Sequence, residues 1–310
     1  MKGLVAAPHT PMHSDLSLNL GMIEQQAAWL SNSGVVGVFF GGTTGEWSSL
    51  TTSERAELQS AWGGLDTNLK RVAHVGHNCQ QDAIDLASHA GRVGVDAIAA
   101  VAPSFLKPAC PDALAEYFAP IASAANALPF YVYHFPGLSH VKLAPVDQIG
   151  ACARVIPSFA GLKYTDPDLL SFARCRAEFG DQFELMWGVD ELLLGAMPFG
   201  VTAAVGSTYN YAAPLYIEMM DAFHRGDHDH AQACSMRVLE LVDLLMAYDV
   251  LAAGKALMSL RGVECGPVRP PVVALSAGRR NELCQKVMAA DMIDVITSDQ
   301  GRSIPVTAID

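Results

Sequence analysis

Eight short apolar segments recur along the chain, and stretches with helix-like patterning separate them. Such segments, rich in β-branched and aromatic residues, are typical of buried strands, and strands that alternate with crossover helices form parallel sheets. Eight units of this kind in about 220 residues fit a closed barrel better than an open, doubly wound sheet. We therefore predict an α/β fold, a (β/α)8 TIM barrel. The predicted strands are residues 3–7, 35–40, 71–75, 96–101, 130–135, 159–164, 183–187 and 202–205.

The segments between the strands have the periodicity of amphipathic helices. One of them opens with a capping box, Thr51-Thr52-Ser53-Glu54. Roughly the last 90 residues carry only helix-like patterning, and Pro267, Pro270 and Pro271 indicate a break between two helices. We predict a barrel domain over residues 1–222, which carries the active site, and a C-terminal helical extension over residues 223–310 packed on it. The other predicted helices are residues 18–30, 80–90, 112–124, 145–152 and 168–178.

Composition restricts the kinds of partner. Of the 310 residues, 51% are hydrophobic and 17% are charged, which favours a large buried core over long disordered tails. The net charge of −12 and the lack of any Lys/Arg cluster disfavour nucleic acid or an anionic membrane as a partner. No segment reaches membrane-spanning length without a charge, Gly or Pro, and the N-terminal apolar stretch is too short for a signal peptide. We expect a small-molecule substrate and a cytoplasmic location.

Neither the cysteines nor the histidines indicate a metal site. The cysteines are odd in number and form no C-x-x-C pair, so we interpret them as small apolar side chains in a reducing compartment. His224 and His228 have the i, i+4 spacing of a helical metal site, with His230 close by, but Gly226 interrupts the turn and aspartates alternate with the histidines. We expect a solvent-exposed patch, no metal and no cofactor. The cysteines are Cys79, Cys110, Cys152, Cys175, Cys234, Cys265 and Cys284.

Lys163 is the residue that most strongly indicates chemistry, because it ends a predicted barrel strand, Phe159-Ala160-Gly161-Leu162-Lys163-Tyr164. In such barrels, functional groups lie at the carboxyl ends of the strands and in the loops that follow. Desolvation inside the barrel would lower the pKa of the amine, which is the condition for attack on a ketone to form an iminium ion. From the local sequence alone, the alternative is a lysine that extends from the strand end into solvent.

A glycine- and threonine-rich loop, Gly41-Gly42-Thr43-Thr44-Gly45-Glu46, follows the second predicted strand. Its glycines permit a tight turn that exposes backbone N–H groups and the hydroxyls of Thr43 and Thr44, which suits a carboxylate. It is neither a Walker A loop nor a G-x-G-x-x-G fingerprint. Taken alone, such a loop is more often an ordinary turn.

Two further strand ends carry polar groups. Tyr133, near the end of the fifth strand, could relay protons beside the lysine, although buried tyrosines are more often packing residues. Trp187-Gly188-Val189-Asp190-Glu191 follows the seventh strand and offers a Gly turn with two acids that suit the hydroxyls of a polyol. Its alternative role is a helix N-cap.

Together these motifs resemble the dihydrodipicolinate synthase/N-acetylneuraminate lyase family of pyruvate-handling aldolases. The resemblance runs from the Thr10-Pro11 turn through the Gly-Gly-Thr-Thr-Gly-Glu loop and the Tyr-x-x-Pro segment at Tyr133 to Gly161-Leu162-Lys163, and so covers nearly the whole chain. It implies a Schiff base at Lys163 and a proton relay at Tyr133. It also implies a homotetramer, because members of the family are usually tetramers. The residues implied to hold the pyruvate carboxylate are Thr43 and Thr44, and those implied to read a sugar's hydroxyls are Thr165, Gly188, Asp190, Glu191 and Ser207.

Residue 138 separates the branches of the family. The synthase branch binds a second carboxylate with an arginine five residues after the tyrosine, and this chain has Leu138 there. An aliphatic side chain cannot replace a bidentate guanidinium, so the resemblance favours the lyase branch and implies reversible cleavage of N-acetylneuraminate. Two departures from the lyase pattern, Gly137 and His140, bear on substrate preference. The alternatives are another 2-keto-3-deoxy sugar acid, such as 2-keto-3-deoxygluconate, as the substrate, or a non-catalytic small-molecule sensor.

Overall fold

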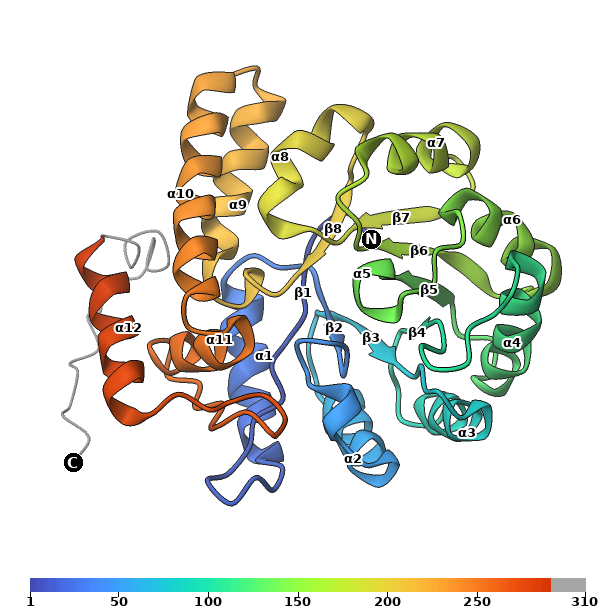
Figure 1. Cartoon of the computed structure of the whole chain (residues 1–310), viewed down its shortest axis with the longest axis horizontal. Coiled ribbons are helices and arrows are strands. Elements are labelled where there is room, and N and C mark those ends of the chain that lie inside the picture. Colours follow the sequence, from blue (N-terminus) through green and yellow to red (C-terminus); the bar gives the residue numbers. More distant parts are fainter. Residues whose placement is uncertain (291–310) are drawn as a thin grey trace.

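The computed structural model describes residues 1–290, so residues 291–310 of the predicted extension lie outside the described part. Eight strands form a closed barrel in sequence order, each pairing in parallel with its neighbours, and β1 closes the ring against β8. Helices surround this barrel (Figure 1). The prediction of a (β/α)8 barrel is confirmed.

All eight predicted strands are present, with ends within two residues of those expected from the sequence. Each strand is short and almost wholly buried, because its two faces pack against the barrel interior and against the surrounding helices. The strands are β1 (Gly3–Ala6), β2 (Gly37–Phe40), β3 (Lys70–His74), β4 (Ala97–Val101), β5 (Phe130–His134), β6 (Phe159–Tyr164), β7 (Glu184–Trp187) and β8 (Ala203–Gly206).

The crossover helices also follow the sequence pattern. The capping box is formed: Thr51 Oγ1 accepts a hydrogen bond from the Glu54 N–H at 3.2 Å, and Glu54 accepts one from the Thr51 N–H at 2.8 Å. The helix predicted to start at residue 18 begins at Ile23, after a 3-10 turn over Leu20–Met22. The helices are α1 (Ile23–Asn32), α2 (Thr52–Gly63), α3 (Gln80–Ala90), α4 (Pro111–Ala124), α5 (Pro136–Ser139), α6 (Pro145–Val155), α7 (Leu169–Phe179) and α8 (Leu193–Ala196).

Alternation along the strands divides the buried side chains into two cores. The smaller core fills the barrel and includes Val5, Phe39, Tyr131, Tyr133 and Met186. The larger core lies between the strands and the outer helices. Because successive side chains of a strand point to opposite faces, Lys163 shares the inward face of β6 with Gly161.

Four helices follow β8 in the described residues and gather on one side of the barrel, next to α1 (Figure 1). The first begins at Tyr209, directly after β8, which is earlier than the helical patterning from residue 216 indicated. The segment with Pro267, Pro270 and Pro271 lies between the last two helices, as predicted. The helices are α9 (Tyr209–His224), α10 (His228–Met246), α11 (Val250–Ser259) and α12 (Ala277–Ala289). No helix within residues 1–290 combines the length and apolar character needed to cross a bilayer.

Candidate active site

Lys163 lies inside the barrel at the carboxyl end of β6 and is 5% exposed. Its Nζ is 4.1 Å from the ring centroid of Phe39 and 4.1 Å from that of Tyr133. Burial lowers the pKa of Lys163 to about 7, and the nearby carboxylate of Asp190 opposes this shift. A substantial fraction of this amine is therefore neutral near neutral pH, which is what nucleophilic attack on a ketone requires.

Tyr133 lies beside the lysine, because the two residues are partners in the pairing of β5 with β6. Its hydroxyl is 3.2 Å from Thr43 Oγ1. Tyr133 therefore contacts both the amine and the glycine- and threonine-rich loop of residues 41–46 (the threonine loop). Burial raises the pKa of Tyr133 to about 12. The phenol therefore stays protonated near neutral pH and can donate a proton to a group bound between it and Lys163.

The threonine loop connects β2 to the segment before α2. Gly41 has φ +64°, a conformation that favours glycine, and Glu46 adopts the left-handed conformation at φ +58°. Thr10 donates a hydrogen bond from Oγ1 to the Gly45 carbonyl at 2.7 Å, and the Trp47 N–H donates to the Gly42 carbonyl at 3.2 Å. These contacts hold the loop over the barrel mouth, with Thr43 half-buried and Thr44 buried.

A buried ion pair fixes the end of this loop to the C-terminal helices. Lys255 of α11 and Glu46 are both 2% exposed at the side chain, and the Lys255 Nζ lies 2.7 Å from Glu46 Oε1. The other carboxylate oxygen of Glu46 accepts a hydrogen bond from the Arg269 N–H at 2.7 Å. The sequence gives no sign of this contact, because Glu46 and Arg269 are separated by 223 positions.

His74, at the end of β3, is a second residue of the site that the sequence analysis did not single out. Its Nδ1 is 3.0 Å from the Gly41 carbonyl, its Nε2 accepts a hydrogen bond from the Val101 N–H at 3.3 Å, and its ring packs edge-on against Tyr133. Burial, together with the positive charges of Arg55 and Lys163, lowers the pKa of His74 well below its usual value. The neutral ring therefore carries its proton on Nδ1 and supports the start of the threonine loop.

Asp190 follows β7 and is buried beside the loop after β8. Its Oδ2 accepts hydrogen bonds from the N–H and Oγ1 of Thr208, at 2.8 and 2.6 Å, and lies 3.5 Å from Ser207 Oγ. Burial raises the pKa of Asp190, although the bonds from Thr208 lower it in part. The Asp190 carboxylate is thus close enough to Lys163 to raise the pKa of the amine. The Ser207 hydroxyl lies beside the same carboxylate.

Thr165 and Gly188 lie side by side at the ends of β6 and β7. A Cβ on Gly188 would lie 2.2 Å from Thr165 Oγ1 and 2.9 Å from the Tyr164 carbonyl oxygen, so a larger residue would displace the Thr165 hydroxyl and crowd the backbone of β6. Within the described residues, the Thr165 hydroxyl is buried and has no hydrogen-bond partner. Glu191 is half-buried, and burial raises its pKa. A buried hydroxyl without a partner at the mouth of the barrel is suited to bind a polar group of a ligand.

Comparison with known proteins agrees with this geometry. The sequence model of the dihydrodipicolinate synthetase family matches residues 1–290. The chain belongs to this family.

The most similar relatives include N-acetylneuraminate lyase A of Xenopus laevis, which is 38% identical over a match that covers 94% of this chain and 98% of that protein. N-acetylneuraminate lyase of Proteus mirabilis superposes with a TM-score of 0.91 at 35% identity, covering 94% of this chain and 99% of that one. N-acetylneuraminate lyase of Aliivibrio salmonicida gives a TM-score of 0.91 at 37% identity, covering 94% and 97% of the two chains.

In this member of the dihydrodipicolinate synthetase family, the segment after Tyr133 forms the short helix α5. Leu138 is 57% exposed and Gly137 is also exposed. His140 follows the helix in the left-handed conformation at φ +54°, which glycine adopts without strain. The two departures from the lyase pattern therefore lie on an exposed turn, and one of them places an L-residue at a position that favours glycine.

Proposed function

We propose that this protein is a class I aldolase that reversibly cleaves N-acetylneuraminate to N-acetylmannosamine and pyruvate through a Schiff base at Lys163. The observation that carries the proposal is the buried amine of Lys163, with a pKa of about 7, in contact with the ring of Tyr133. The lyase names of relatives that match almost the whole chain support the choice of reaction.

In the proposed reaction, the neutral amine of Lys163 adds to the C2 ketone of the open-chain substrate, one proton is taken up and water leaves, which forms an iminium ion. The C4 hydroxyl then loses its proton and the C3–C4 bond breaks, so that C4 becomes the aldehyde carbon of the released N-acetylmannosamine and the bond's electrons move into the iminium to give an enamine. Protonation of the enamine at C3 and hydrolysis release pyruvate and restore the amine. Because the iminium accepts the electrons, the reaction does not call for a metal or an external cofactor.

The surrounding groups have distinct roles in this proposal. Thr43 and Thr44 hold the carboxylate of pyruvate. Tyr133 carries protons to and from the reacting oxygen atoms, for which its high pKa and its 3.2 Å contact with Thr43 Oγ1 are favourable. The residues proposed to bind the sugar's hydroxyls are Thr165, Gly188, Asp190, Glu191 and Ser207.

The exposed Leu138 supports a lyase rather than a synthase. A synthase of this family binds an aldehyde with a second carboxylate, and an exposed leucine offers that anion neither charge nor hydrogen-bond donors. His140 lies in the left-handed conformation two residues after Leu138, at the end of the same helix α5. Because His140 departs from the lyase pattern, the second candidate substrate is a 2-keto-3-deoxy sugar acid without the N-acetyl group.

Turnover of N-acetylneuraminate and of 2-keto-3-deoxygluconate, measured as pyruvate release by the same preparation, tests the proposal. We expect a higher kcat/KM for N-acetylneuraminate. Preference for 2-keto-3-deoxygluconate would contradict the choice of substrate but keep the mechanism. Release of pyruvate from neither sugar would contradict the aldolase proposal and favour a sensor that binds a small molecule. Lys163→Arg, which keeps the charge but not the nucleophile, is the matched control and should be inactive.

We also propose a homotetramer located in the cytoplasm, with the site in a barrel unit of residues 1–222 and an extension over residues 223–310. The exposure of Phe105, Leu106 and Leu170 supports self-association, because these three large apolar side chains are 83%, 82% and 68% exposed in the single chain.

A further inference from the structure

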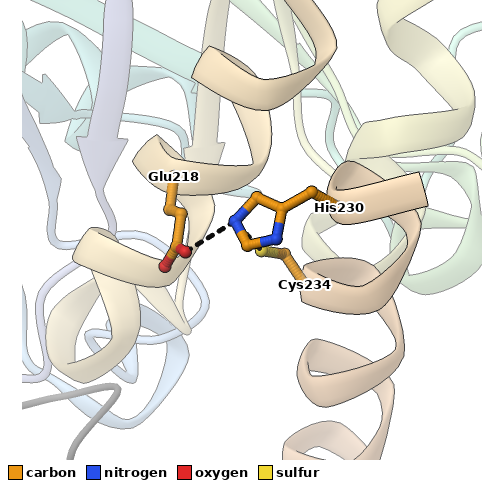
Figure 2. A group of neighbouring side chains, drawn as sticks. All are labelled: Glu218, His230 and Cys234. Atoms are coloured by element: carbon orange, nitrogen blue, oxygen red, sulfur yellow. Dashed lines mark hydrogen bonds and ion pairs between the residues drawn. The ribbon is translucent and has the colours of Figure 1, made fainter. Parts of the chain in front are cut away.

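The three histidines of the expected surface patch do not come together as a group. His224 ends α9 and His228 begins α10, and all three histidines are exposed. His230 instead faces a glutamate of α9 and a cysteine one turn further along α10 (Figure 2). Glu218, His230 and Cys234 each offer one ligand atom, and these atoms all lie within 4.8 Å of one another.

We propose that Glu218, His230 and Cys234 bind a divalent transition-metal ion of the zinc type, which joins α9 to α10 on the outside of the barrel. This site is separate from the proposed catalytic centre, and the proposal does not depend on the aldolase activity.

The spacing of the residues places the ligands on facing surfaces. His230 and Cys234 are four residues apart on α10 and so lie on one face of the helix. Glu218 reaches them from α9, because the turn at residues 225–227 reverses the chain, with Gly226 at φ +78°. Figure 2 shows the carboxylate and the imidazole pointing toward each other, with the sulfur below the ring.

The distances are close to those that a metal needs. Glu218 Oε1 lies 2.7 Å from His230 Nε2, and Cys234 Sγ lies 3.8 Å from the same nitrogen. In a tetrahedral zinc site, ligand atoms are separated by about 3.3 to 3.7 Å, given Zn–N near 2.0 Å and Zn–S near 2.3 Å. The side chains of His230 and Glu218 are 43% and 49% exposed, so they are free to move apart from 2.7 Å to the separation that a metal requires.

The chemistry of the three donors selects the class of metal. Imidazole with thiolate favours zinc and related ions over magnesium or calcium, which prefer oxygen ligands only. On binding, the thiol proton of Cys234 leaves to solvent and a metal–sulfur bond forms. In the contact with Glu218 the Nε2–H donates to the carboxylate, so on binding the metal this proton also leaves Nε2, the remaining imidazole proton lies on Nδ1, and Nε2 binds the ion. Three protein ligands leave the fourth tetrahedral position to water.

Titration of the full-length protein with Co²⁺ and Zn²⁺ tests the proposal. Cys79 and Cys110 are exposed and lie outside the proposed site, so their thiols could also bind the added metal. The parent for all variants therefore carries Cys79→Ser and Cys110→Ser. We expect one Co²⁺ per chain with a near-ultraviolet thiolate-to-cobalt absorption band, displacement by Zn²⁺, and a higher thermal unfolding temperature with Zn²⁺.

Cys234→Ser should remove the charge-transfer band and weaken Zn²⁺ binding by at least about tenfold. Glu218→Gln should weaken binding while keeping the band, which keeps the test informative if Cys234→Ser folds poorly. His228→Gln, an exposed histidine of the same helix outside the group, is the matched control and should bind like the parent. Absence of the thiolate band, or equal Zn²⁺ affinity of Cys234→Ser and its parent, would overturn the proposal.

Discussion

At the scale of single residues, the environment of Lys163 determines its chemistry. The amine has aromatic rings on two sides and a carboxylate nearby, and desolvation outweighs the carboxylate in setting its pKa. The sequence indicates the lysine, because an ammonium group is out of place in an apolar strand. It does not indicate Phe39 or His74 as its neighbours, because closure of the barrel brings those side chains to it from β2 and β3.

The pKa of Lys163 gives a testable pH dependence. Only the neutral amine attacks the ketone, so the rate of imine formation with pyruvate should rise as the pH increases through about 7 and level off about one unit above. Rapid-quench trapping of the imine at a series of pH values measures this rate. A rate that keeps rising toward the ordinary lysine pKa of about 10.4 would show that the amine is solvated.

At the scale of elements, the strands and helices could be predicted because hydrophobic periodicity and one capping box mark them. Contacts between distant elements could not. The ion pair between Glu46 and Lys255 joins a loop after β2 to α11, and no local pattern connects positions so far apart. The group of Glu218, His230 and Cys234 was missed for the same reason, because its first member lies on another helix.

The approach of β6 to β7 depends on Gly161. This residue has φ +150°, and a Cβ added there would lie 1.9 Å from the Glu184 carbonyl oxygen. We expect Gly161→Ala to lower the free energy of unfolding by at least about 2 kcal/mol, because the strands must move apart or the backbone must strain.

Urea unfolding followed by circular dichroism measures the effect. Gly278→Ala is the matched control, because a Cβ at that exposed position meets nothing within 4 Å, and it should change stability by less than about 1 kcal/mol. Equal stability of the two variants would contradict this account of the strand contact.

Breaking the buried ion pair should affect both stability and substrate binding. Glu46→Gln leaves the charge of Lys255 buried without its partner, which costs about 3 kcal/mol of unfolding free energy. We also expect a higher KM, because the threonine loop loses its attachment to α11. The double variant Glu46→Gln/Lys255→Met should be more stable than Glu46→Gln alone, since it leaves no unpaired charge. A double variant that is no more stable than Glu46→Gln would contradict this reading.

At the scale of the whole molecule, the barrel follows from the number and order of the strand segments, whereas assembly rests on surface properties. Phe105 and Leu106 are exposed in the loop after β4, and Leu170 is exposed on α7. Scattered apolar residues on a surface are normal, but an adjacent pair of large ones that are more than four-fifths exposed favours a contact with another chain.

Sedimentation equilibrium tests the proposed homotetramer. With a chain mass of 33.0 kDa, we expect a particle of four times that mass. Phe105→Asp should shift the distribution toward smaller species, while a matched change of the exposed Met246 to Asp should not. A monomer at all concentrations would contradict the proposed assembly and leave the catalytic proposal intact.

We propose that the buried amine of Lys163 forms an imine with pyruvate, and borohydride reduction followed by peptide mass spectrometry is the direct test of this imine. We expect the mass of reduced pyruvate on the peptide that contains Lys163, and no such addition in Lys163→Arg or when pyruvate is left out. An unmodified Lys163 peptide, or an adduct found only on another lysine, would contradict the claim.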